Sequence, residues 1–341
     1  MTELIKELCA LCGTSGDEDA VRDFIISKLP DDVSYKTDAL GNLIVEKKGS
    51  MPAKNKVMLA AHMDEVGFIV TYITSDGYLR ISPVGGINPE TVIGRQLQFK
   101  NGTRGVIGTK AIHQQSESER DKPVKISSML LDIGVKSEAE ALEKVLPGDC
   151  AYFTGEFLEF GSNDDMLKSK ALDDRAGCAV MIEMINSDLP YDATFVFTVQ
   201  EEIGTRGAKA AAYTVAPDYA IVLETTTACD FSGNEGEKKV CEVGKGAVVS
   251  YMDNGTIYSR NLYRMAFDKA REKNIPCQTK TVVAGGNDSG AIHVSAGGIE
   301  TVAISAPCRY LHSPACVLSK KDMKAVADLA YEMYIALAEK E

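Results

Sequence analysis

The sequence lacks tryptophan, and it lacks any apolar run approaching the ~20 residues that a membrane helix needs. Positive charge is also scarce, because 37 lysines and arginines stand against 49 aspartates and glutamates, for a formal net charge of −12. A protein with this charge has no basic stripe that could displace counterions from phosphate groups. We therefore expect no nucleic-acid partner and no membrane partner.

The chain also lacks the usual marks of secretion and of several common enzyme classes. Its first residues contain no basic segment followed by an apolar one, so no signal peptide is predicted and a cytoplasmic location is expected. The nine cysteines are odd in number and scattered, which in such a chain favours reduced thiols. The H-E-x-x-H, P-loop, G-x-S-x-G and G-x-G-x-x-G patterns are absent. Any chemistry must come from dispersed residues.

What is present is an α/β pattern with an interruption. Apolar strands alternate with helices before about residue 66 and again after residue 168, and the run 56–61 is nearly all apolar, as in a sheet covered on both faces. Between residues 66 and 160, short strands alternate with glycine-rich turns, and a capping box predicts one helix from Ser137 to Leu146. We therefore predict one α/β domain interrupted by a small β-barrel or β-sandwich.

Five apolar or small-residue runs lead to residues that can bind a metal. These residues are His62 with Asp64, the pair Asp173-Asp174, the pair Glu201-Glu202, Glu224 and His312. Ligands of open α/β sheets gather beyond the carboxyl ends of the strands, so we expect these side chains at one place. Two imidazoles with a surplus of carboxylates suit a pair of divalent cations such as Zn²⁺, Co²⁺ or Mn²⁺. The pattern indicates a metal-assisted hydrolase.

Each of these features also has an ordinary structural explanation. His62 and His312 can be structural histidines, Asp173-Asp174 can complement a helix dipole, and Glu224 can end a strand in solvent. The pair Glu201-Glu202 is harder to explain in this way, because two adjacent carboxylates at the mouth of a buried strand repel each other unless a cation is near. Adjacent side chains point in different directions, which suits one as a ligand and the other as a base. All five features together are improbable by chance.

The motifs resemble those of the M42 family of dinuclear metallo-aminopeptidases, which includes glutamyl and deblocking aminopeptidases and the tetrahedral peptidases. The resemblance extends over essentially the whole chain, and its main stretches are AHMDEVG at 61–67, ALDDRAG at 171–177, VQEEIG at 199–204 and RYLH at 309–312. One departure is Glu224, where many relatives carry aspartate. The longer side chain still supplies a carboxylate.

The resemblance implies a role for each site residue. The metal ligands would be His62, Asp173, Glu202, Glu224 and His312. Asp173 would bridge two divalent ions per subunit, with zinc or cobalt favoured and manganese as a further option. Two ions ~3.5–4 Å apart would lower the pKa of a shared water. Glu201 would be the general base that takes its proton, and Asp64 would orient His62.

The resemblance also implies the architecture and the activity. The fold would be phosphorylase/hydrolase-like α/β/α with a mixed central sheet. A catalytic domain would comprise residues 1–65 and 163–341, and a β-rich, barrel-like oligomerisation domain would comprise residues 66–162. The enzyme would be an aminopeptidase acting on peptides with a free N-terminus, and it would form homo-oligomers, with dimers assembling into dodecamers.

A glycoside hydrolase of the endoglucanase kind is the alternative. Some relatives carry that name, and Glu201 with another carboxylate could act as a glycosidase pair. The missing tryptophan argues against it, since glucan sites usually stack sugars on broad aromatic faces, and clustered imidazoles serve a glycosidase poorly. A non-enzymatic scaffold is less favoured still. For His113, His293 and Cys316 we expect structural roles.

Overall fold

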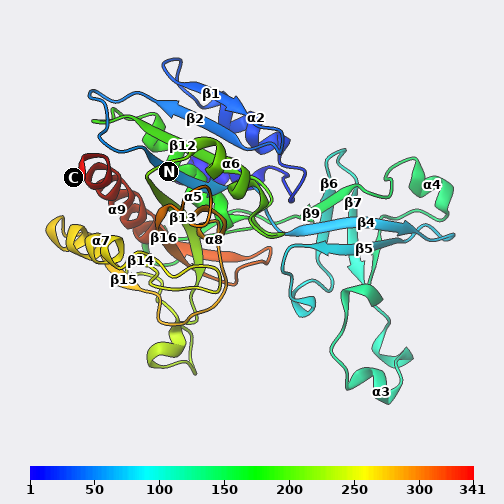
Figure 1. Cartoon of the computed structure of the whole chain (residues 1–341). Helices are drawn as coiled ribbons and strands as arrows, with labels where there is room; N and C mark the ends of the chain where they lie inside the picture. The colour runs from blue at the N-terminus through cyan, green and yellow to red at the C-terminus, as the bar shows by residue number, and fades with distance from the viewer.

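The computed structural model describes residues 1–341, apart from the side chains of residues 118 and 119. It contains two sheets, and Figure 1 shows them as two modules side by side, one built of helices and a large sheet and the other a barrel. No helix in the described chain is both long enough and apolar enough to span a bilayer.

The larger sheet is mixed. Its eleven strands are β1 (Ser34–Thr37), β2 (Leu43–Lys47), β3 (Val57–His62), β10 (Leu158–Phe160), β11 (Met166–Ser169), β12 (Ala193–Thr198), β13 (Tyr219–Thr227), β14 (Ala247–Val249), β15 (Cys277–Thr279), β16 (Glu300–Arg309) and β17 (Cys316–Ser319). Nine of them follow the order β1-β2-β12-β3-β13-β16-β17-β11-β10, and β14 pairs with both β15 and β16. The central strands β12, β3, β13 and β16 run parallel, whereas β2 and β17 join them antiparallel.

Helices cover both faces of this sheet. They are α1 (Thr2–Ala10), α2 (Asp19–Ser27), α5 (Leu172–Ile185), α6 (Arg206–Val215), α7 (Arg260–Glu272), α8 (Ser289–Ile292) and α9 (Lys320–Glu339). Alternate residues of a strand point to opposite faces. Leu59 accordingly belongs to the main core with α1, α2, α5, α7 and α9, whereas its neighbour Ala60 packs in a second core with α6 and α8. The predicted α/β/α fold with a mixed sheet is confirmed.

The second module is a closed antiparallel barrel with its own apolar core. Its strands, in the order β4-β5-β8-β7-β6-β9, are β4 (Gly67–Ile73), β5 (Leu79–Val84), β8 (Leu130–Asp132), β7 (Arg104–Gly108), β6 (Gln96–Phe99) and β9 (Cys150–Phe153). The rings of Phe68 and Phe153 meet edge to face in the core, with centroids 5.6 Å apart. Closure leaves the barrel without a free sheet edge.

Short helices lie in the connections of the barrel and in the loops of the larger module. They are α3 (Glu117–Arg120), α4 (Glu138–Leu142) and the 3₁₀ turns η1 (Pro89–Thr91), η2 (Ile112–Gln114), η3 (Ile126–Ser128), η4 (Ser162–Asp164) and η5 (Gly236–Lys239). The hydroxyl of Ser137 caps α4 by accepting a hydrogen bond from the amide of Glu140 at 3.3 Å, as the capping box predicts. β10 pairs with β11 in the larger sheet, so the barrel itself ends with β9.

One strand differs from the prediction in a way that matters for the site. The sequence places Glu224 at the end of its strand, but β13 continues to Thr227, because β16 pairs with it residue by residue from Glu300 to Cys308. Glu224 therefore lies inside a buried strand, with its carboxylate held away from bulk solvent.

A buried cation fixes the first helix against the sheet. The guanidinium of Arg175, which is fully buried, donates to the backbone carbonyls of Leu8 and Met63, each at 2.7 Å. Next to it the ammonium of Lys170 pairs with the Glu65 carboxylate at 2.5 Å and donates to the carbonyl of Leu11. Buried charges are tolerated when they are paired and hydrogen-bonded in this way.

Candidate metal centre

The predicted ligands come from five separate segments. His62 is the last residue of β3, Asp173 lies in the first turn of α5, and Glu224 lies within β13. Glu202 follows β12, and His312 lies in the turn between β16 and β17. The parallel strands β3, β12, β13 and β16 bring these segments to one region of the sheet.

Two groups of possible ligand atoms form there. One contains His62, Asp174 and Glu224, and the other contains Asp173, Glu202 and His312, with the ligand atoms in each group within 4.8 Å of one another. The structure therefore brings together all five predicted ligands. It also adds Asp174, whose fully buried Oδ2 has no hydrogen-bond partner. The sequence singled out Asp174 only as the neighbour of Asp173.

Asp173, a member of the second group, also faces the first. Its Oδ1 is 3.3 Å from Nε2 of His62, and its Oδ2 is 3.5 Å from Nε2 of His312. Nε2 of His62 is also 3.5 Å from Oε1 of Glu224, and Nε2 of His312 is 3.4 Å from Oε2 of Glu202. One carboxylate thus presents one oxygen to each group, as a bridging ligand must.

The electrostatics fit a site that holds cations. Burial raises the pKa of Glu202 and of Glu224 to about 8 each, and the charge of Asp173 adds to both shifts. Burial opposes ionisation of Asp173 too, but the neighbouring imidazoles of His312 and His62 outweigh it and hold its pKa well below the usual range. Among the largest effects on these three carboxylates, the imidazoles of His62 and His312 are the groups that lower their pKa. The orphaned oxygens of Asp173 and Asp174 also fit metal ligands.

Asp64 holds several parts of the site in place. Its carboxylate accepts hydrogen bonds from the amides of Glu201 at 3.0 Å and Glu202 at 3.1 Å and from the hydroxyl of Ser15 at 2.6 Å. Oδ1 of Asp64 is also 3.5 Å from Nδ1 of His62. A single buried carboxylate therefore holds the turn that carries the predicted base and lies beside a predicted ligand imidazole. Ser15 is a supporting residue that sequence reasoning missed.

Glu201 is outside both groups of possible ligands. Its backbone is held by Asp64, and burial raises the pKa of its side chain well above the usual value, with the charge of Glu224 adding to the shift. Glu18 supports the same turn, because its carboxylate accepts a hydrogen bond from the amide of Gln200 at 3.1 Å. Glu201 is therefore a carboxylate beside the possible ligands that is not itself one of them.

The remaining histidines and cysteines lie outside the two groups. His113 is exposed in η2, and Nδ1 of His293 contacts the carbonyl of Ser289 at 2.8 Å. Cys316 is buried, and its thiol contacts the carbonyl of Ser313 at 3.4 Å. Cys9 and Cys12 have the C-x-x-C spacing, but all nine cysteines are free thiols. Burial raises the pKa of Cys9 to about 12, which disfavours a thiolate.

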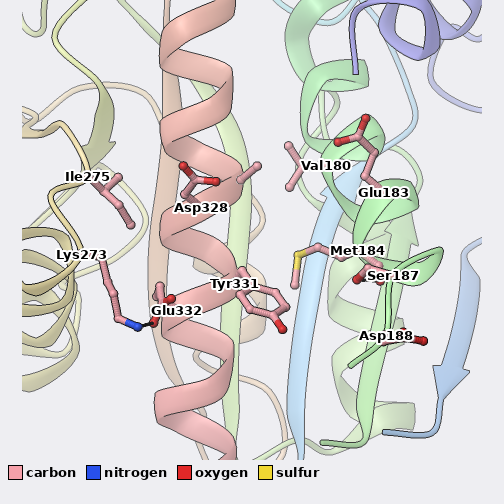
Figure 2. Close-up of a pocket in the computed structure, with 11 residues that line it drawn as sticks. Val180, Glu183, Met184, Ser187, Asp188, Lys273, Ile275, Asp328, Tyr331 and Glu332 are labelled. Atoms are coloured by element: carbon pink, nitrogen blue, oxygen red, sulfur yellow. Dashed lines mark hydrogen bonds and ion pairs between the residues drawn. The ribbon is translucent and has the colours of Figure 1, made fainter. Parts of the chain in front are cut away.

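A cavity of about 510 Å³ lies elsewhere, between α5, α9 and the segment that follows α7. Figure 2 shows the Lys273 amine directed at Glu332, and these two groups pair at 3.1 Å. Of the other carboxylates there, Glu183 pairs with the N-terminal ammonium and Asp328 with Lys324. Three of the four carboxylates that line the cavity, all but Asp188, pair with a cation, and no histidine lines it, so the cavity does not compete with the metal centre.

Comparison with known proteins gives consistent matches along the chain. The family model for the M42 glutamyl aminopeptidase matches residues 41–329. A protein from Acetivibrio thermocellus, whose aminopeptidase assignment is provisional, is 41% identical over 337 residues, which are 97% of this chain and 98% of that protein. The lysyl aminopeptidase of Pyrococcus furiosus is 35% identical and covers 96% of this chain and 95% of its own length.

Solved structures match over the same length. The TET1 peptidase of Pyrococcus horikoshii, which can assemble into a tetrahedron or a large octahedral shell, is 34% identical with a TM-score of 0.85 and covers 99% of each chain. A structure from Thermotoga maritima that carries the name endoglucanase is 34% identical with a TM-score of 0.78, and it covers 97% of this chain and 98% of its own.

Proposed function

This chain belongs to the M42 glutamyl aminopeptidase family and is an aminopeptidase, as its motifs predict, and on that premise we propose that it uses two divalent ions, with Glu201 as the general base. The observation that carries the two-ion proposal is the position of Asp173. Its two oxygens face the imidazoles of His62 and His312, which belong to different groups of ligand atoms.

The ligands divide into two sets that share Asp173. His62 and Glu224 would hold one ion, and Glu202 and His312 would hold the other. Zinc and cobalt suit this mixture of imidazole and carboxylate, and manganese is a further option. When bound, two such ions lower the pKa of a shared water and polarise the scissile carbonyl.

The chain's own residues supply proton transfer and orientation. Glu201 accepts a proton from the attacking water and delivers it to the leaving amine, a role open to a carboxylate that lies outside both groups of ligand atoms. Asp64 contacts both the backbone amide of Glu201 and the imidazole of His62, so it keeps the base and this ligand in a fixed relative position. A free α-amine on the substrate would bind beside the ions and restrict cleavage to the N-terminal residue.

Glycoside hydrolysis remains the second candidate, because some structural neighbours carry the name endoglucanase. The chain has no tryptophan for stacking sugars. The acidic groups in the site surround two imidazoles, whereas a glycosidase needs only a pair of carboxylates across a glycosidic bond. Both features favour peptide hydrolysis.

A substrate comparison tests the proposal. Free-amine peptides are expected to lose one residue at a time from the N-terminus, and N-acetylated forms of the same peptides are expected to resist, because acetylation removes the positive charge of the amine and delocalises its lone pair into an amide. Mass spectrometry of timed digests measures both, with carboxymethyl-cellulose as the glycan control. Equal cleavage of free and blocked peptides, or comparable turnover of the glycan, would refute aminopeptidase action at this site.

We also propose that the barrel mediates self-association. Several of its apolar side chains face solvent in the single chain, including Tyr72 at 59%, Ile112 at 71% and Leu146 at 54% exposure. Apolar side chains that are more than half exposed in the single chain are candidates for burial by a partner. A second copy of the chain is the proposed partner, because the TET1 peptidase assembles into closed shells. Dimers that join into dodecamers are the expected form.

Sedimentation measures this assembly. The intact protein is expected to sediment at multiples of its 36.8 kDa chain mass at micromolar concentration. Replacing Tyr72, Ile112 and Leu146 by serine should shift it toward single chains, because an apolar interface loses its driving force. Serine at Tyr213 and Ile257, which are 72% and 74% exposed in the catalytic module, is the matched control. A parent protein that sediments as a single chain would overturn the proposal.

A further inference from the structure

We infer that the barrel module positions a metal ligand of the catalytic module, and that it does so through the backbone carbonyl of Gly86, which orients His312. Gly86 follows β5, a barrel strand, and lies 226 residues before His312 in the chain. The inference rests on the proposed function, in which His312 binds one of the two ions. It adds a positioning group that comes from outside the catalytic sheet.

The contact fixes which nitrogen of His312 faces the ion. Nδ1 of His312 is 2.7 Å from the carbonyl oxygen of Gly86, whereas Nε2 faces Glu202 and Asp173. A carbonyl oxygen can only accept a hydrogen bond, so Nδ1 must carry the hydrogen. In the neutral imidazole the lone pair is then on Nε2, directed at the site. Metal-binding histidines are commonly held by such a bond from the other ring nitrogen.

His312 depends on this bond more than His62 depends on its own. Nδ1 of His62 contacts the carbonyl of Asp64, two residues away in the same segment, and the side chain is only 2% exposed. The His312 side chain is 38% exposed and lies in a turn, at a backbone φ of +57°. Fewer neighbours confine its ring, so the Gly86 carbonyl contributes a larger share of its orientation.

The absence of side chains at residues 85 and 86 permits the approach. A Cβ at Gly86 would lie 3.3 Å from Nδ1 and 3.7 Å from Cε1 of His312. A Cβ at Gly85 would lie 3.2 Å from Cβ of Glu202. This glycine pair therefore packs against two ligands of the same proposed ion, His312 and Glu202. In the other ligand group, Nδ1 of His62 is instead held by the carbonyl of Asp64, which belongs to the catalytic module itself.

The two proposed ions should therefore respond differently to the barrel. The ion held by Glu202 and His312 has a ligand whose orientation depends on a second module. A displacement of the loop after β5 would therefore lower the affinity for this ion first. The affinity for the ion held by His62 and Glu224 should not change on such a displacement.

Cobalt titration of metal-free Gly86→Ala tests the inference. The added methyl group crowds the His312 ring, and outer hydrogen bonds of this kind typically contribute ~10–100-fold to metal affinity. Visible absorption of bound Co²⁺ should then show one affinity weakened by roughly 10–100-fold and the other unchanged. Gly108→Ala is the matched control, because it is also a barrel glycine without a positive φ and its added Cβ would meet nothing closer than 3.9 Å. It should leave both affinities unchanged.

A double-mutant cycle separates positioning from general damage. In a His312→Ala background, Gly86→Ala should produce no further loss of Co²⁺ affinity, because the group through which it acts is gone. Equal weakening of both sites by Gly86→Ala, the same loss with and without His312, or two unchanged affinities would each overturn the inference. If His312→Ala alone leaves both affinities intact, it is the proposed function that fails, since His312 is then no ligand.

Discussion

Glu201→Gln is expected to lower kcat by roughly 10²–10⁴-fold, the range typical of losing a general base. Glutamine keeps the size of the side chain and the backbone hydrogen bond to Asp64, but it cannot accept a proton at neutral pH. Because Glu201 is outside both groups of ligand atoms, the variant should keep the parent's metal content. Steady-state kinetics and metal analysis of the same preparation measure the two quantities.

Glu202→Gln is the matched control for that result. The two residues are adjacent, both are hydrogen-bonded to Asp64 through their amides, and the substitution is the same. The Glu202 variant should lose affinity for the ion beside His312, since an amide oxygen is a poorer ligand than a carboxylate. If the Glu201 variant is the one that loses metal while retaining its rate, the roles of base and ligand are exchanged.

Complete removal of metal is expected to abolish peptide hydrolysis, and Co²⁺ or Zn²⁺ should restore it with two ions bound per chain. Without cations, the raised pKa values of Glu202 and Glu224 imply that both carboxylates take up protons near neutral pH, and nothing then lowers the pKa of the attacking water or polarises the scissile carbonyl. Activity before and after dialysis against a chelator, with metal content measured in parallel, checks this. Full activity in metal-free protein would contradict the two-ion proposal.

Asp173→Asn extends the metal experiment. An amide has a single oxygen, so it cannot present one oxygen to each ion as the Asp173 carboxylate does. The variant is expected to bind at most one ion tightly. A variant that still binds two ions with the affinities of the parent would show that Asp173 does not bridge them.

The convergence of the site was predictable from sequence because it depends on strands that are buried on both faces. β3 and β12 are nearly continuous apolar runs, and a polar residue at the end of such a run is conspicuous. The strands β11 and β17 were not predicted. They are four residues long and carry polar residues, so their pairing depends on each other and not on a local pattern.

The supporting contacts were beyond sequence reasoning for a different reason. Gly86 acts through its backbone carbonyl, and a carbonyl carries no sequence signal. Its contact with His312 depends on how a separate module packs against the catalytic one. The orientation of Asp174 toward His62 and Glu224 likewise depends on the backbone at the start of α5. The identities of the ligands are local features, whereas the groups that orient them are products of the complete fold.

The buried guanidinium of Arg175 sets a boundary for anyone shortening this protein. A fragment trimmed to residues 41–329, the span that the family model matches, would retain every predicted ligand and the base. It would nevertheless lose Ser15, which donates to Asp64, and the Leu8 carbonyl that accepts from Arg175. Arg175 would keep the Met63 carbonyl and the Glu65 carboxylate but lose its buried hydrogen bond to the missing carbonyl, and a buried donor left without its acceptor costs about 1–3 kcal/mol. The minimal catalytic unit therefore begins with its first helix, although that helix contributes no side chain to the chemistry.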